Sequence, residues 1–139
     1  MPKVFTSKTQ KKGEIGENIA ARFLVKQGYA ITERNYTKKW GEIDIIAQKD
    51  KKLYFAEVKS VARADLEGIE SKGQGSKDEY RPEDNMHPWK AKRLSRTIQT
   101  YLLSKNIPED KEWEVMLVLV YLDLEHKKAK VKIIQDVIL

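Results

Sequence analysis

The stretch GEIDIIAQKDKKLYFAEVKSV, residues 41–61, predicts two β-strands joined by a short polar loop. The first strand, GEIDIIAQ (41–48), is rich in β-branched residues, and the second, LYFAEVKSV (53–61), adds aromatic ones. This composition is typical of paired strands. The tetrad 49–52 between them is charged throughout and is expected to form the loop. We therefore predict an antiparallel hairpin here.

The flanking sequence predicts two helices and three further strands. Apolar residues recur every three or four positions before Gly28 and again after Pro88, as on the buried face of a helix. A near-continuous apolar run, WEVMLVLVYL, is typical of a strand buried on both faces. The expected elements are helices over 13–27 and 88–105 and strands over 29–36, 112–123 and 130–135, with a turn at 38–41. The order α-β-β-β-α-β-β predicts an α/β or α+β fold with a mixed sheet and packed helices.

The chain has 139 residues, which corresponds to one domain. We expect a basic, flexible tail over 1–12 and a single domain over 13–139. Within that domain, residues 62–86 are charged, contain glycine and are weakly patterned, which predicts a long loop that is functional or disordered. A short helix over 62–69 is a further possibility.

Composition excludes several classes of site. The chain contains no cysteine, so it has no disulfide scaffold, Cys-type zinc site, iron–sulfur cluster or thiol nucleophile. No apolar run approaches the roughly 20 residues of a membrane span, and the basic N-terminus lacks the apolar segment of a secretory signal. We expect a cytoplasmic protein without a membrane partner. The net charge of +6 permits a nucleic-acid partner without establishing one.

Charged residues in the predicted hairpin indicate a metal site. Alternation places Ile43 and Ile45 on a core-facing side and Asp44 on the other, while Glu57 and Lys59 share one side of the next strand. If the strands pair, Asp44 and Glu57 come within a few ångströms, since Cβ atoms of antiparallel neighbours lie about 4.5–5.5 Å apart. Two such carboxylates favour a Mg²⁺ or Mn²⁺ ion between them, and Lys59 could hold a water or stabilise phosphate charge.

Each of these residues also has a simpler interpretation. Glu57 and Lys59 could belong to an ordinary solvated strand face. Glu17, at the border of the apolar stripe of the first helix, could reach over the sheet towards the acids. It could equally be a first-turn acid favoured by the helix dipole.

Candidate nucleic-acid contacts lie on the second helix and on the 38–41 turn. Lys90, Arg93 and Arg96 flank the apolar stripe of the helix and could contact phosphates, or could simply be solvated. Lys39 and Trp40 are the candidates on the turn. Trp40 could stack on an unpaired base or form a hydrophobic cap on the hairpin.

Three segments together resemble the YraN-like family of small bacterial proteins: GEIGENIAARFLVKQGYAITERNY (13–36), GEIDIIAQ (41–48) and LYFAEVKS (53–60). That family is similar to archaeal-type Holliday junction resolvases of the PD-(D/E)XK nuclease superfamily. The resemblance implies a restriction-endonuclease-like sheet of four to five strands flanked by helices. By position, Asp44 and Glu57 match the two superfamily acids, Lys59 the lysine and Glu17 the helical acid of the resolvase-like branch.

The resemblance further implies that these acids hold one or two Mg²⁺ ions, that the lysine positions the attacking water, and that the protein acts as a homodimer. Residue 43 is isoleucine where proline is common in the superfamily. The expected function is metal-dependent endonuclease activity on structured or branched DNA. Two alternatives remain open: a non-catalytic nucleic-acid-binding protein of the same fold, and a protein-interaction subunit.

Overall fold

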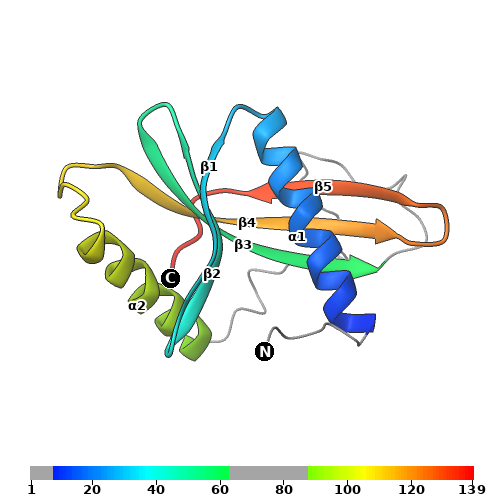
Figure 1. Cartoon of the computed structure of the whole chain (residues 1–139), viewed down its shortest axis with the longest axis horizontal. Helices are drawn as coiled ribbons and strands as arrows, with labels where there is room; N and C mark the ends of the chain where they lie inside the picture. The colour runs from blue at the N-terminus through cyan, green and yellow to red at the C-terminus, as the bar shows by residue number, and fades with distance from the viewer. Residues whose placement is uncertain (1–7, 63–87) are drawn as a thin grey trace.

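The structure, a computed structural model, describes residues 8–62 and 88–139. A five-stranded mixed sheet carries two helices (Figure 1). The elements are α1 (Lys8–Lys26), β1 (Ala30–Lys38), β2 (Gly41–Lys49), β3 (Lys52–Ala62), α2 (Pro88–Ser104), β4 (Trp113–Asp123) and β5 (Lys128–Ile134). The predicted order α-β-β-β-α-β-β is confirmed, and the arrangement is compatible with a restriction-endonuclease-like fold.

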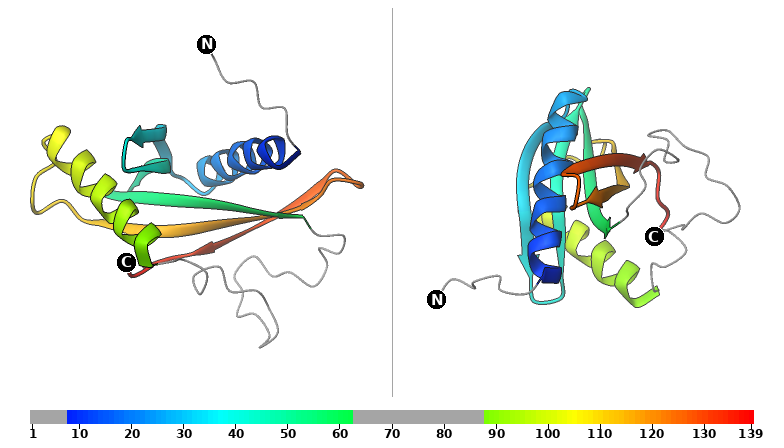
Figure 2. Two further views of the ribbon diagram at one scale, coloured as in Figure 1. Left: turned by 90° about the horizontal axis from the view of Figure 1, so that it is seen from below. Right: turned by 90° about the vertical axis from the view of Figure 1, so that its right-hand side faces the viewer.

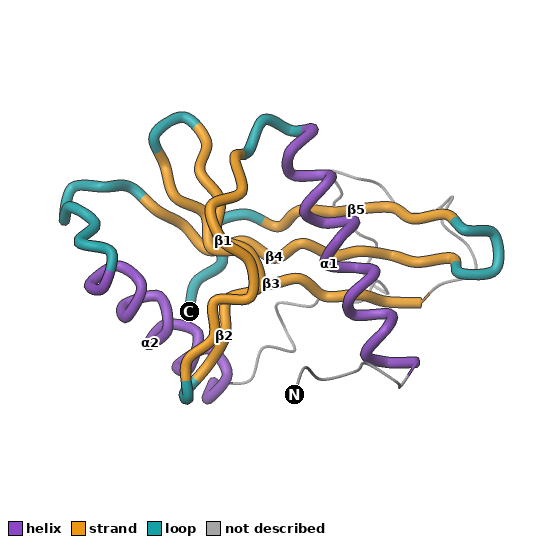
Figure 3. Tube along the Cα trace, in the orientation of Figure 1, coloured by secondary structure: helices purple, strands orange, loops and turns teal. Residues whose placement is uncertain are grey.

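The strands lie in the order β1-β2-β3-β4-β5. Only β3 and β4 are parallel; the other neighbours are antiparallel. The parallel pair follows from the connection through α2, because parallel strands need a long crossover. Strands β2 and β3 run side by side near their turn and then diverge, so that the rest of β2 crosses the direction of β3, β4 and β5 (Figure 3). This fork in the sheet positions the candidate site.

The two helices lie on opposite sides of the sheet (Figure 2). Apolar residues form a separate core under each of them. Under α1, Ala20 and Leu24 pack against residues of β2, β3 and β4 that include Ala56. Under α2, Leu94 and Ile98 pack against a cluster from β2, β3 and β4. Every residue of β4 after Trp113 is buried. The prediction of a strand buried on both faces is therefore confirmed.

The predicted side-chain alternation in β2 is wrong at one point. Ile43 lies in the α2-side core with Ile46, whereas Ile45 lies in the α1-side core with Ala47. The pairing of β2 with β3 ends at Ile45, and beyond it β2 is paired only with β1. Freed from β3, the strand turns, and the simple two-residue period is lost.

Two predicted boundaries also need correction. Helix α1 begins at Lys8, so the tail predicted over 1–12 is wrong for residues 8–12. That first turn of the helix lacks the apolar periodicity on which the prediction relied. The predicted tetrad loop is a two-residue turn, because Lys49 and Lys52 pair and only Asp50 and Lys51 adopt positive φ angles, of 50° and 66°. The predicted loop over 62–86 and the possible helix over 62–69 lie, but for Ala62, outside the described residues.

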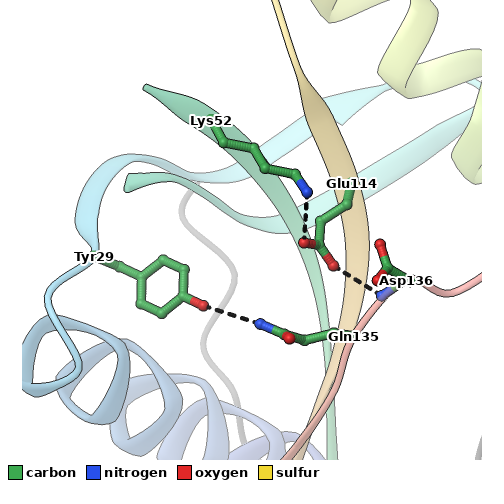
Figure 4. A network of polar contacts seen from close by, with 5 residues as sticks. All are labelled: Tyr29, Lys52, Glu114, Gln135 and Asp136. Carbon is green, nitrogen blue, oxygen red and sulfur yellow. Dashed lines mark hydrogen bonds and ion pairs between the residues drawn. The ribbon is translucent and has the colours of Figure 1, made fainter. Parts of the chain in front are cut away.

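A buried carboxylate ties β3, β4 and the C-terminal segment together (Figure 4). Glu114, near the start of β4, is only 8% exposed. Its Oε1 pairs with Lys52 Nζ at 3.0 Å, and its Oε2 accepts a hydrogen bond from the backbone N–H of Asp136 at 2.8 Å. The ion pair and the hydrogen bond satisfy both oxygens, as burial of a charge requires. Glu114 therefore serves the fold at the edge where β3 and β4 begin.

Close packing of α1 on β3 depends on Gly16. A Cβ atom at this position would lie 1.7 Å from Ser60 Oγ and 2.9 Å from Ser60 Cβ. A side chain larger than hydrogen would therefore force the Ser60 side chain to rotate and would press α1 against its Cβ. Because Glu17 is the next residue, this contact also sets how closely its carboxylate approaches the sheet.

We expect Gly16→Ala to lower the free energy of unfolding by about 1–3 kcal/mol, the usual cost of overpacking a tight contact. Urea denaturation measures the change. Gly13→Ala, in the same helix with no atom within 4 Å of its added Cβ, is the matched control and should be neutral or stabilising. Adding Ser60→Gly to Gly16→Ala should restore most of the loss; a Gly16→Ala protein as stable as the wild type would contradict the prediction.

Candidate active site

A cavity of about 360 Å³ opens between α2, the β1–β2 turn and the fork of β2 and β3. Three acids and three cations line it together with Leu94. The acids are Glu42, Asp44 and Glu57, and the cations are Lys38, Lys90 and Arg93. The cavity therefore gathers charged groups from the end of β1, from the predicted hairpin and from a helix that follows it by many residues.

Asp44 and Glu57 come together because the β2–β3 ladder ends just before them. The last paired residues are Ile45 and Ala56, so Asp44 and Glu57 are the next residues on each strand, at the base of the fork. The backbone N–H of Val58 donates a hydrogen bond to the Asp44 side chain, with 2.8 Å between Val58 N and Asp44 Oδ2. This hydrogen bond holds the Asp44 carboxylate across the fork.

Burial and crowding of like charges perturb Asp44 strongly. Burial penalises its charged form, and the nearby Glu57 carboxylate adds repulsion, so the pKa of Asp44 rises from 3.8 to about 8. The hydrogen bond from Val58 lowers the pKa but does not outweigh these effects. A carboxylate held at this cost in a cavity is characteristic of functional sites.

Glu57 already has a cationic partner. Its side chain is 14% exposed, and Oε1 lies 3.1 Å from Lys90 Nζ at the start of α2. The ammonium group thus partly neutralises the acid pair from the helix side. The sequence predicts Lys90 as a phosphate contact, and in the structure it faces the acids directly.

Glu17 approaches the acids from the opposite face of the sheet. It lines a neighbouring cavity with Asn18, Arg34, Asn35 and Glu42. Burial raises the pKa of Glu17, and the charge of Glu42 raises it further, while Arg34 lowers it. Glu57 contributes a weaker repulsion. Glu17 therefore belongs to the same electrostatic cluster as the fork acids without lining their cavity.

Asn35 and Glu42 join the two cavities. With its amide nitrogen facing the carboxylates, Asn35 donates to Glu42 Oε1 at 3.0 Å and to Glu17 Oε2 at 3.3 Å. Burial, and then the charge of Glu57, raises the pKa of Glu42. Sequence reasoning missed both residues. Glu42 shares the alternation that singled out Asp44. Asparagine is depleted in strands, so its presence at position 35 was a further signal in the sequence.

The family described as "Uncharacterised protein family UPF0102" matches residues 16–121 of this chain. The chain belongs to the UPF0102 family. A UPF0102 protein of Campylobacter fetus subsp. fetus is 38% identical over 122 residues, covering 88% of this chain and 88% of that protein. UPF0102 proteins of a Sulfurovum species and of Flavobacterium psychrophilum are 36% identical over 108 residues and 34% over 124. These cover 77% and 89% of this chain, and 76% and 90% of the respective relatives.

The match confirms the predicted YraN-like relationship at the level of the family. The matched range of this UPF0102 chain contains Glu17, Asp44, Glu57 and Lys59. It also contains Glu42 and all of α2, so the whole cavity lies within the region that defines the family.

Lys59 of this UPF0102 chain lies on the same strand as Glu57. It follows Glu57 by two residues and so projects from the same side of β3. It is partly buried, and within 8–62 and 88–139 the residues that line the cavity do not include it. The structure brings Lys90 to Glu57, and the predicted convergence of the acids beside the Lys59 amine stays a prediction.

The predicted nucleic-acid contacts separate into two groups. Lys39 is exposed on the β1–β2 turn, and Arg93 is exposed on α2 and lines the cavity. Trp40 instead packs towards α2, where the Arg96 guanidinium lies 4.4 Å from its ring centroid. Next to it, Gly41 approaches α2 so closely that a Cβ would lie 2.5 Å from Thr97 Oγ1. This packing favours the interpretation of Trp40 as a cap that fastens the hairpin to the helix.

The carboxylates at the fork suit a hard cation that needs only one or two protein ligands. Among residues 8–62 and 88–139, no three His, Cys, Asp or Glu side chains are grouped to hold a metal ion. Two carboxylates, Asp44 and Glu57, do lie together, and Mg²⁺ is commonly bound by one or two carboxylates with waters and substrate phosphate completing its shell. Burial raises the pKa of Asp44 and repulsion by Glu57 raises it further, and a bound cation would offset both effects by favouring the ionised carboxylate. The residues present therefore fit Mg²⁺ or Mn²⁺ at the fork.

Within the part of the chain that the structure describes, neither helix is both long enough and apolar enough to span a bilayer.

Proposed function

We propose that this UPF0102 protein is a divalent-metal-dependent endonuclease that hydrolyses phosphodiester bonds in structured or branched DNA. The observation that carries the proposal is the pairing of Asp44 and Glu57 at the fork of β2 and β3, inside a cavity with cations on its rim. Burial and the nearby Glu57 carboxylate raise the pKa of Asp44, so its negative charge is held there at an energetic cost. A solvated strand face would not impose that cost.

Each residue then has a defined task. Asp44 and Glu57 would hold Mg²⁺ or Mn²⁺, and the bound ion would polarise a phosphate oxygen and acidify a water. Val58 orients the Asp44 carboxylate through its backbone N–H. Arg93 and Lys90, on the rim, attract the phosphate backbone. Glu17 and Glu42, linked by Asn35, keep the surrounding field negative and so favour a cation.

A non-catalytic nucleic-acid-binding protein of the same fold is the second candidate. The ion pair of Lys90 with Glu57 favours it, because it lowers the negative charge that would otherwise repel phosphate. This candidate predicts salt-sensitive DNA binding with no turnover in any metal. A two-fold homodimer is part of the nuclease proposal, since branched junctions are themselves two-fold symmetric.

The proposal is tested by incubating the purified chain with a four-way junction, a flap and a linear duplex. We expect cleavage in Mg²⁺ or Mn²⁺, with the branched DNAs cut faster than the duplex and all cutting abolished by EDTA. Absence of products from every DNA in both metals, with retained binding, would exclude the nuclease and leave the second candidate.

Replacing Lys90 should strengthen metal binding. Its ammonium lies 3.1 Å from Glu57 Oε1 and competes with a cation for that oxygen. Because Lys90 is half exposed, the competition is worth at most about 1 kcal/mol. We therefore expect Lys90→Met to bind Mn²⁺ about two- to fivefold more tightly in isothermal titration calorimetry. Lys92→Met, an exposed lysine on the same helix, is the matched control, and an equal or weaker affinity of Lys90→Met would contradict the prediction.

A further inference from the structure

Helix α2 carries two tryptophan–arginine stacks that differ in their surroundings. Arg96 lies over Trp40 where the β1–β2 turn packs on the helix, and the indole Nε1 of Trp40 is buried. Arg93 lies over Trp89 with its guanidinium carbon 4.0 Å from the ring centroid. Trp89 is nevertheless 56% exposed. Leaving so large an aromatic surface in contact with water has an energetic cost, and tryptophan is enriched at the surfaces by which proteins bind other molecules.

The exposed stack is connected to the acidic cavity through Arg93. This residue lines the cavity with Asp44 and Glu57 and also covers the Trp89 ring. Its backbone is fixed on the other side, because its carbonyl oxygen accepts a hydrogen bond from Thr97 Oγ1 at 2.7 Å. The same oxygen lies beside Gly41, where the hairpin reaches the helix. The Trp89–Arg93 surface is thus anchored next to the fork acids.

A tryptophan ring with a guanidinium stacked over it binds flat, electron-rich groups by further stacking, and the guanidinium also binds phosphate through its N–H groups. A nucleotide has both parts. In a continuous duplex both faces of each base are covered by its neighbours, so only an unpaired or unstacked base can lie on such a surface. Lys90, one residue after Trp89, adds a second cation for the phosphate.

We propose that Trp89 and Arg93 form a subsite for one unpaired nucleotide beside the cavity of Asp44 and Glu57. The inference rests on the proposed function in taking DNA as the ligand. It deepens that function by assigning the preference for branched DNA to a single unpaired base at the branch. The simpler alternative is that the stack only rigidifies the start of α2, in which case Trp89 would affect stability without distinguishing DNA forms.

Binding of an oligothymidylate and of a blunt duplex of the same length separates these interpretations. Both are measured by fluorescence anisotropy in EDTA, so that no turnover is involved. We expect Trp89→Ala to weaken oligothymidylate binding about tenfold and duplex binding less than twofold, because stacking on one base is lost. Trp89→Phe should keep most of the affinity. Lys92→Ala, the charge control on the same helix, should weaken both DNAs equally.

Equal losses for the two DNAs, or no loss for either, would overturn the proposal. Tryptophan fluorescence provides a measurement that needs no destabilising variant. Oligothymidylate should quench the wild-type protein more than Trp89→Phe, and equal quenching would also overturn the subsite. All these experiments measure binding without metal. The subsite can therefore be supported even if no DNA is cleaved, and it can be excluded even if cleavage is observed.

Discussion

Asp44→Asn and Glu57→Gln should each reduce cleavage of branched DNA by at least about 100-fold, the scale of losing one preorganised electrostatic group from an active site. Both substitutions keep the size and shape of the side chain and remove its charge. In Asp44→Asn the amide oxygen can still accept the hydrogen bond from the Val58 N–H, so the fork should keep its geometry. Rates are measured with saturating Mn²⁺ on the fastest-cleaved DNA of the panel.

Glu125→Gln is the matched control for the loss of one negative charge, because Glu125 is exposed in the β4–β5 turn, away from the cavity-lining residues. It should leave the rate unchanged. Circular dichroism of all three variants checks the fold. If Asp44→Asn and Glu57→Gln cleave like the control, the fork acids do not carry the reaction and the assignment of the site is wrong.

Asp44→Asn should at the same time make the protein more stable at neutral and alkaline pH. In the unfolded chain the Asp44 carboxyl ionises near pH 4, whereas in the native state its pKa is about 8. Between these values the native state holds a proton that the unfolded state has released. The stability contribution of Asp44 is therefore fully present below the unfolded pKa and is lost as the pH rises through the folded pKa.

Between pH 6 and pH 8 the wild-type free energy of unfolding should fall by about 2 kcal/mol more than that of Asp44→Asn. Urea denaturation in EDTA at several pH values measures both profiles. Mg²⁺ should flatten the wild-type profile and leave that of Asp44→Asn unaltered, because a cation favours the ionised carboxylate. Parallel profiles for the two proteins would show that Asp44 is not perturbed as described.

If both predictions hold, the Asp44 carboxylate is needed for activity but lowers the free energy of unfolding. Burial penalises the charge of Asp44 and Glu57 repels it, so a neutral residue at position 44 would make the native protein more stable. Such a trade of stability against activity is common where charges are concentrated for chemistry. Failure of the first prediction with success of the second would point to a structural or binding role of the perturbed carboxylate.

Local pattern was enough to predict most of the secondary structure. The apolar run of β4 and the stripe of α2 appear in the structure where periodicity places them, because a buried face must be continuous in sequence at a fixed period. The same reasoning, with the short loop between the strands, indicated that Asp44 and Glu57 would be neighbours. The motifs in their order also pointed to the family to which the chain belongs.

Only the tertiary structure decided which core each residue of β2 enters and which charged residues meet at the fork. Both depend on where β2 leaves β3 and on how α2 packs beside them. Alternation could not predict that Ile43 and Ile45 enter different cores, because β2 turns once it leaves β3. Nor could it place Lys90 on Glu57, since the two residues are brought together by the crossover through α2 and not by any local spacing. Sequence periodicity reports which face of an element is buried, whereas the charge partners at an open fork are set by distant elements meeting in space.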